Sequence, residues 1–169
     1  MDAAAQITAC SHAPNTLNSM KYEDSSRPVT FRFANMDDVP DVLALWKVAA
    51  ENDARPNDDV TKTAALIDRD AEALEIAIID DRIVGSLVSG WDGWRAHLYR
   101  LAVHPDARRR GIGRKLLIRA EARLKLLGAN RIDAMVLEHN ELGQSIWTAE
   151  GYAKQPEWCR WVRAVANGS

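Results

Sequence analysis

The pattern of apolar and polar positions divides most of this chain into short strands and helices. Residues 29–34 alternate between apolar and polar side chains, as a half-buried strand does, and residues 39–50 place apolar side chains at helical spacing. A second helix is expected over 58–70. Two strands over 74–79 and 83–89 are separated by a tight turn and predict a hairpin.

The second half of the chain continues the alternation of strands and helices. A fourth strand is expected over 96–103, and the helix after it carries an apolar face and a basic face up to Gly128. A fifth strand over 131–138 and a short helix from 140 to 151 follow. Tyr152 and residues 158–165 are expected to supply one or two last strands, so the predicted order is β-α-α-β-β-β-α-β-α-β-β.

The two ends of the chain and its composition predict one domain in a reducing compartment. Residues 1–27 show no sustained period and predict a disordered N-terminal extension, followed by a single domain over 28–169. Cys10 and Cys159 are too few for a disulfide framework. Since the sequence has neither an apolar run of membrane-spanning length nor a signal-peptide pattern, we expect a cytoplasmic protein without a membrane partner.

Charge is distributed unevenly. The formal net charge is −2, yet residues 108–128 contain eight Lys or Arg residues and one Glu. A nucleic-acid-binding protein usually spreads its basic surface more widely, so no nucleic-acid partner is expected. His, Cys and Asp residues form no cluster with metal-ligand spacing, and we expect no metal.

The turn between the fourth strand and the next helix has the composition of an anion site. Three arginines precede Gly111, Ile112 and Gly113, where the helix begins. The first NH groups of a helix have no partner within it, and glycine lets a phosphate oxygen approach the backbone. Neither of the two common nucleotide loops, G-x-x-x-x-G-K-[ST] and G-x-G-x-x-G, is complete here.

Two segments resemble motifs of the GNAT family of N-acetyltransferases. Arg108-Arg109-Arg110-Gly111-Ile112-Gly113 resembles the family's [QR]-x-x-G-x-[GA] loop, which holds the pyrophosphate of acetyl-CoA. The segment 140–152 resembles N-x-x-A-x-x-[LF]-Y-x-x-x-G-[FY], with Gly143 in place of the usual alanine. The resemblance covers roughly 29–165. It implies an α/β (α+β) GNAT fold: a mixed, mostly antiparallel sheet of six to seven strands, flanked by about four helices and splayed between strands 4 and 5.

The same resemblance implies acetyl-CoA as the co-substrate. Its pantetheine arm would lie in the gap between strands 4 and 5 and pair with the backbone of the fourth strand. The backbone NH of Val103 would donate to the thioester oxygen as negative charge develops there. The residues implied in cofactor binding are Leu101, Ala102, Val103, Arg108, Arg109, Arg110, Gly111, Ile112, Gly113, Arg114, Asn140 and Trp147.

Trp147 departs from the family pattern, since many relatives carry there a tyrosine that protonates the leaving thiolate. An indole NH is not a usable acid. Water, a neighbouring hydroxyl, or unaided departure of a thiolate with a pKa of about 8.5 would have to replace it. Trp147 would still form a wall of the acetyl pocket.

A general base is expected because an aliphatic amine is mostly protonated at pH 7. His97 stands where histone-type relatives carry a glutamate, and a histidine side chain titrates near pH 6.5. Tyr99 lies two residues further on the same strand face, and Glu138 lies near the end of the fifth strand. All three fit ordinary structural roles as well, so the base stays open.

For the acceptor, the resemblance points to the first helix, the loop after it and the hairpin region. The corresponding residues are Trp46, Glu51, Asn52, Asp53, Trp91, Asp92 and Trp94. Acidic side chains beside tryptophans would suit a cationic amine. Trp46 fits a core position too, and the acidic cluster after it fits a solvated loop.

The sequence therefore predicts an acyltransferase that moves the acetyl group of acetyl-CoA to a primary amine of a small molecule. The amine would attack directly in a ternary complex, and the protein would be a monomer or homodimer. One alternative has another donor, such as a longer acyl-CoA or an acyl carrier protein, or a protein N-terminus as the acceptor. Another is a non-catalytic CoA-binding or sensing domain, which Trp147 favours.

Overall fold

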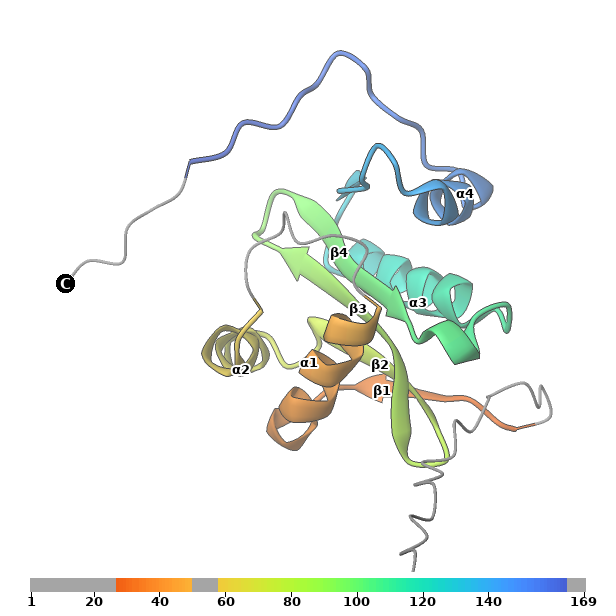
Figure 1. Cartoon of the computed structure of the whole chain (residues 1–169). Coiled ribbons are helices and arrows are strands. Elements are labelled where there is room, and N and C mark those ends of the chain that lie inside the picture. Colours follow the sequence, from red (N-terminus) through yellow and green to blue (C-terminus); the bar gives the residue numbers. More distant parts are fainter. Residues whose placement is uncertain (1–26, 50–57, 164–169) are drawn as a thin grey trace, which may run out of the picture.

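The computed structural model of the chain describes residues 27–49 and 58–163 (Figure 1). The predicted N-terminal extension lies outside the described residues except for Arg27, and so do the candidate acceptor residues Glu51, Asn52 and Asp53. The described strands are β1 (Thr30–Phe33), β2 (Leu74–Ile79), β3 (Arg82–Trp91), β4 (Ala96–Val103) and β5 (Ile132–Ala134). The α-helices are α1 (Val39–Val48), α2 (Val60–Arg69), α3 (Ile112–Leu126) and α4 (Glu141–Ala149).

The five strands form a single mixed sheet in the order β1-β2-β3-β4-β5. Neighbouring strands are antiparallel except β4 and β5, which are parallel because the chain crosses over through α3 between them. Pairing between β4 and β5 covers only Ala96–Leu98 against Ile132–Ala134. Because β5 ends at Ala134, this edge of β4 has no partner strand beyond Leu98 in the described chain, and the sheet is open at this point.

Helices cover both faces of the sheet (Figure 1). On one face α1 and α2 enclose a core that includes Val42, Ile76 and Val88. On the other face α3 packs its apolar side against β2, β3 and β4, with Leu116 and Leu124 fully buried. Burying this apolar surface is the main stabilising contribution, at about 25 cal/mol per Å².

Close contact between α3 and the sheet depends on Gly85 in β3. A Cβ atom at this position would lie 2.9 Å from Cγ2 of Ile112 and 3.2 Å from Cδ1 of Leu116. The first turn of α3 is thereby held against β3, next to the end of β4. This contact sets the position of the helix N-terminus relative to the unpaired edge of β4.

A β-bulge interrupts β4 just beyond its pairing with β5. Ser86 pairs with Ala102 and Val88 pairs with Tyr99, so Arg100 and Leu101 together face one residue of β3. Arg100 takes a φ of 56°, which is uncommon for a residue with a side chain. Its carbonyl oxygen accepts a hydrogen bond from Ser86 Oγ at 3.1 Å. The bulge reverses the alternation of inward and outward side chains for the rest of the strand.

The prediction of six to seven strands is wrong for the described residues, which form five. The fifth strand ends at Ala134 instead of residue 138, and residues 152–163 contain no strand. Trp158, Trp161 and Val162 are instead 73%, 90% and 76% exposed. A strand needs a neighbour to satisfy its backbone, and β5 offers only a three-residue edge.

The predicted helix boundaries agree more closely with the structure. α2 starts after Asp59, whose side chain accepts a hydrogen bond from the Lys62 backbone NH, and α4 starts after Asn140. Both caps satisfy an NH group that the first helical turn leaves without a partner. None of the helices in the described part of the chain combines the length and apolar character needed to cross a membrane.

Candidate functional site

A cleft of about 1490 Å³ lies where the edge of β4 is unpaired. Its walls come from β4, the N-terminal turn of α3, and α4 on one side, and from α1 and α2 on the other. It contains most of the residues that sequence reasoning grouped as a cofactor site. Those lining it are Leu101, Ala102, Val103, Arg108, Arg109, Gly111, Ile112, Gly113, Arg114, Asn140 and Trp147.

The edge of β4 facing the cleft is unpaired within the described chain beyond Leu98. Backbone groups of residues 99–103 on this edge are therefore available to an extended ligand that would add like a strand. Arg108 lies over the end of the edge, where its Nε donates to the Val103 carbonyl oxygen at 3.3 Å. The strand edge and the basic turn form one continuous surface.

The N-terminus of α3 forms the other part of this surface. Gly111 precedes the helix with a φ of 72°, and no side chain caps the first turn. A Cβ atom built on Gly111 would have no other atom within 4 Å, so open space lies directly in front of the backbone. Uncapped NH groups with the positive end of the helix dipole and nearby arginines favour a phosphate group.

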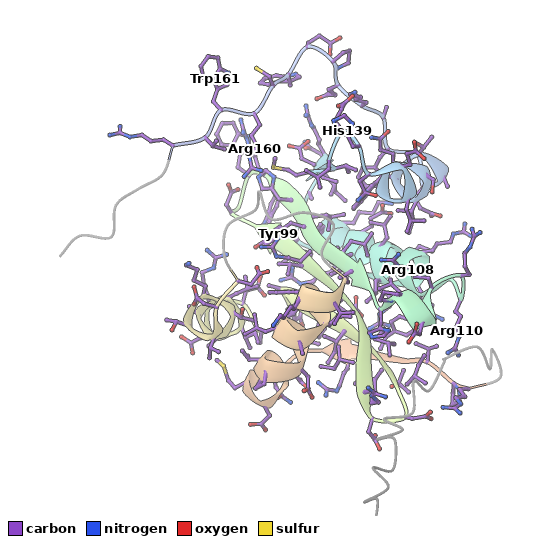
Figure 2. All side chains as sticks on the ribbon, viewed as in Figure 1. Tyr99, Arg108, Arg110, His139, Arg160 and Trp161 are labelled. Carbon is purple, nitrogen blue, oxygen red and sulfur yellow. The ribbon has the colours of Figure 1, made fainter. Side chains whose placement is uncertain are left out.

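Arg110 differs from its two neighbours, because its side chain is absent from the cleft lining. Its Nη2 donates to the Arg27 carbonyl oxygen at 2.6 Å on the outer side of the turn (Figure 2). Arg108 lies on the inner side, at the end of β4 (Figure 2). Three consecutive arginines looked equivalent in the sequence, but only Arg108 and Arg109 line the cleft.

α4 closes the cleft opposite the sheet. Arg114 in the first turn of α3 forms an ion pair with Glu150 at 2.7 Å, which connects the end of α4 to the start of α3. Asn140 Oδ1 accepts the Gly143 NH at 2.5 Å. A Cβ atom on Gly143 would lie 2.5 Å from Asn140 Nδ2, so the glycine permits this capping geometry.

Trp147 is 8% exposed and forms part of the core beneath the cleft while also contributing to its wall. Its ring meets Tyr152 edge-to-face, with 4.9 Å between centroids. Burial and the neighbouring Glu121 raise the pKa of Tyr152. The indole therefore occupies a rigid, apolar position.

The three candidate bases lie in different surroundings. His97 and Tyr99 both line the cleft from the same face of β4. Burial raises the pKa of Tyr99 above 10.0, although the charges of Arg69 and Arg100 act in the opposite direction. Glu138 is absent from the lining, and its hydrogen bond from Lys154 lowers its pKa. Tyr99 is therefore protonated at neutral pH, whereas the Glu138 carboxylate is a weakened base.

The described acceptor candidates separate into two groups. Trp46 lines the cleft, is 5% exposed, and donates through Nε1 to Ser86 Oγ at 2.7 Å. Trp91, Asp92 and Trp94 are absent from the cleft lining. Asp92 accepts hydrogen bonds from the backbone NH groups of Trp94 and Arg95, which lower its pKa and fix the β3–β4 turn.

Several cleft residues had no signal in the sequence beyond a helix or strand assignment. Asp58 forms an ion pair with Arg100 across the cleft floor, where their side chains are 15% and 20% exposed. Arg69 in the last turn of α2 and Arg160 in the C-terminal segment also line the cleft. Only the fold brings these distant positions together.

The geometry as a whole fits an elongated ligand with phosphate groups at one end. An open strand edge would hold a chain with amide groups, the uncapped turn would hold its phosphates, and the far half of the cleft would receive a second molecule. Open space before Gly111 supports this fit independently of the arginines, because a backbone approach there meets no side chain.

Comparisons with known proteins agree with this geometry. The model of the acetyltransferase (GNAT) family matches residues 38–152. An acetyltransferase of Pectobacterium atrosepticum is 36% identical over 111 residues, which span 65% of this chain and 77% of the relative.

Two solved structures share the fold. An aminoglycoside acetyltransferase from an uncultured soil metagenomic sample, in complex with sisomicin, has a TM-score of 0.68 at 16% identity, covering 82% of this chain and 97% of the other. The Salmonella typhimurium protein yncA, with its cofactor acetyl-CoA, has a TM-score of 0.64 at 19% identity, covering 74% and 79%.

Proposed function

Because this chain belongs to the acetyltransferase (GNAT) family and is an acyltransferase, we propose that it transfers the acetyl group of acetyl-CoA to a primary amine of a small molecule. One observation carries the proposal: the unpaired edge of β4 leads directly to the uncapped N-terminus of α3. Backbone groups of Leu101 and Val103 would hold the pantetheine. The turn from Arg108 to Gly113 would hold the pyrophosphate through backbone NH groups and two arginines.

In the proposed reaction the acceptor enters from the α1 and α2 side and attacks in a ternary complex. The neutral amine nitrogen forms a bond to the carbonyl carbon, the carbon–sulfur bond breaks, and its electron pair passes to sulfur. The Val103 backbone NH would donate to the carbonyl oxygen. Trp147 cannot supply a proton to sulfur, so the thiolate leaves as such or is protonated by water.

His97 is the candidate base that best fits the site. It lines the cleft on the acceptor side, whereas Glu138 does not. Tyr99 is protonated at neutral pH because burial raises its pKa, so it is better suited to donating a hydrogen bond than to accepting a proton. The proton released by the amine nitrogen would pass to His97 directly or through water.

The proposed cofactor site is tested with two matched glycine substitutions. Gly111 and Gly128 flank α3, both have positive φ values (72° and 97°), and neither has an atom within 4 Å of a built Cβ. Gly111→Trp and Gly128→Trp therefore impose similar backbone strain, but only Gly111→Trp blocks the cleft. Calorimetric titration should show at least a 100-fold loss of acetyl-CoA affinity for Gly111→Trp, since two charge-assisted hydrogen bonds contribute roughly 3 kcal/mol or more.

Gly128→Trp should bind acetyl-CoA like the wild type. Equal losses in both variants, or no binding by the wild type, would contradict the proposed cofactor site. A carrier-protein thioester would then become the leading donor, because it lacks the nucleotide. Binding without release of free thiol on any amine would instead favour a CoA-sensing role.

A further inference from the structure

The acceptor half of the cleft carries more positive than negative side chains. Its charged lining residues are Lys62, Arg69, Arg100, Arg160, Asp58 and Asp59. Sequence reasoning expected an acidic surface that would bind a cationic amine. Among the described residues the charge balance in this half of the cleft is positive, which favours an acceptor that carries negative charge. The predicted acidic residues Glu51 and Asp53 lie outside the described residues.

Both carboxylates in this half are already neutralised by partners. Asp58 is paired with Arg100, with an Nε to Oδ1 distance of 2.8 Å. Asp59 caps α2 and forms an ion pair with Lys62 Nζ at 2.7 Å. These two pairs leave little negative charge to attract an ammonium group.

Arg69 differs from Arg100 and Lys62, which have carboxylate partners. The carboxylates that follow Arg69 in the sequence pair with Arg123 instead. Asp70 accepts two hydrogen bonds from Arg123 Nη2, each 2.6 Å long, and Glu72 forms an ion pair with Arg123 Nε at 3.4 Å. Among residues 27–49 and 58–163, no carboxylate forms an ion pair with Arg69. Arg69 lines the cleft from the last turn of α2.

Tyr99 shares this part of the cleft with Arg69. The positive charge of Arg69 acts on the tyrosine, lowering its pKa against the larger opposite effect of burial. The guanidinium is therefore close enough to influence the phenol. Arg160 lines the same cleft from the C-terminal segment and lies above Tyr99 in Figure 2. Tyr99, Arg69 and Arg160 thus line the same cleft.

We propose that the acceptor amine carries a carboxylate, as an amino acid does, and that Arg69 binds this group. The inference rests on the proposed acetyltransferase function and names its acceptor class. The planar guanidinium offers paired donors that match the two oxygens of a carboxylate. The protonated Tyr99 hydroxyl donates a further hydrogen bond, and Arg160 adds positive charge from the C-terminal segment.

The test compares pairs of amines that differ only by the carboxylate. Thiol release from acetyl-CoA is measured with phenylalanine against phenethylamine, lysine against cadaverine, and 4-aminobutyrate against propylamine. The wild type should prefer the carboxylate member by roughly 10- to 100-fold in kcat/KM, as expected for one charge-assisted interaction. Arg69→Gln should remove this preference mainly through a higher KM, and Arg69→Lys should restore part of it.

Arg95→Gln is the matched control, because Arg95 is an exposed arginine outside the cleft and its removal changes the net charge equally. It should keep the wild-type preference. The proposal is overturned by equal turnover of both members, by preference for the carboxylate-free member, by turnover of neither member of any pair, or by an unchanged preference in Arg69→Gln. Thiol release itself separates this result from failure of the proposed function, because that failure predicts no release with any amine, whereas release with the carboxylate-free members overturns only the acceptor class.

Discussion

The cap of α4 allows a quantitative test of the site's local structure. Gly143 is the third residue of α4, and a methyl group there would come within 2.5–2.9 Å of three side-chain atoms of Asn140. Gly143→Ala therefore displaces the capping side chain. Loss of an asparagine cap costs about 1 kcal/mol, whereas alanine in place of glycine stabilises a helix by about 0.5–1 kcal/mol. The two terms nearly cancel, so the unfolding free energy should change by less than about 0.5 kcal/mol.

A double-mutant cycle separates the two contributions. Asn140→Ala alone should lose about 1 kcal/mol, because the Gly143 NH loses its partner. In the Asn140→Ala variant, Gly143→Ala no longer displaces a capping side chain and should raise the unfolding free energy by about 0.5–1 kcal/mol. The predicted coupling between the two positions is therefore about 1 kcal/mol. Urea unfolding followed by far-UV circular dichroism measures all four proteins.

The same stabilisation by Gly143→Ala in both backgrounds would refute this account, because it would mean that the methyl group leaves the cap in place. Asn140 also lines the cleft, so the variants report on the proposed cofactor site as well. Acetyl-CoA affinity, measured by calorimetry on the same proteins, shows whether a displaced Asn140 side chain changes binding.

Two further predictions concern the packing of α3. Glu75 is buried and paired with Arg119, whose side chain is 41% exposed. Arg119→Gln should lower the unfolding free energy by about 2 kcal/mol, a value already reduced for solvent screening of the exposed arginine. Glu75→Gln should leave the unfolding free energy nearly unchanged. Burial raises the pKa of Glu75 above 4.5, so its contribution to stability is full below that pH and is lost as the pH rises through the raised value. In urea unfolding, the stability of the wild type relative to Glu75→Gln should fall as the pH rises from 4 to 7, and a parallel pH dependence of the two proteins would contradict this account. Gly85→Ala should lower the unfolding free energy by about 1–3 kcal/mol, because the added methyl would lie 2.9 Å from Ile112, and an unchanged urea midpoint would refute that contact.

Local signals in the sequence predicted much of the fold. The caps at Asp59 and Asn140 and the glycine turn before α3 depend on residues close together in the chain, and the structure shows all three. The β2–β3 hairpin has the same local character. The motif around Gly111 also predicted the acetyltransferase (GNAT) family, and the match of the family model to residues 38–152 confirms this prediction.

The remaining features depend on contacts that no local pattern contains. The C-terminal residues Trp158 to Val162 have strand-like composition, but whether a strand forms depends on the length of the neighbouring edge, and β5 is short. The different directions of Arg108 and Arg110 follow from the conformation of the turn. The ion pair between Asp58 and Arg100 joins positions 42 residues apart. Sequence spacing alone could identify none of these.

The strand order β1-β2-β3-β4-β5 has a consequence for how the molecule is assembled during synthesis. Each strand pairs with the strand made immediately before it, so sheet formation can follow the ribosome without waiting for distant segments. The cleft can be completed only later in synthesis, because its lining residues extend along the chain from Trp46 to Arg160. A nascent chain thus has the greater part of its sheet long before it has both halves of the cleft, and a ligand that fills the cleft can stabilise only the nearly finished protein.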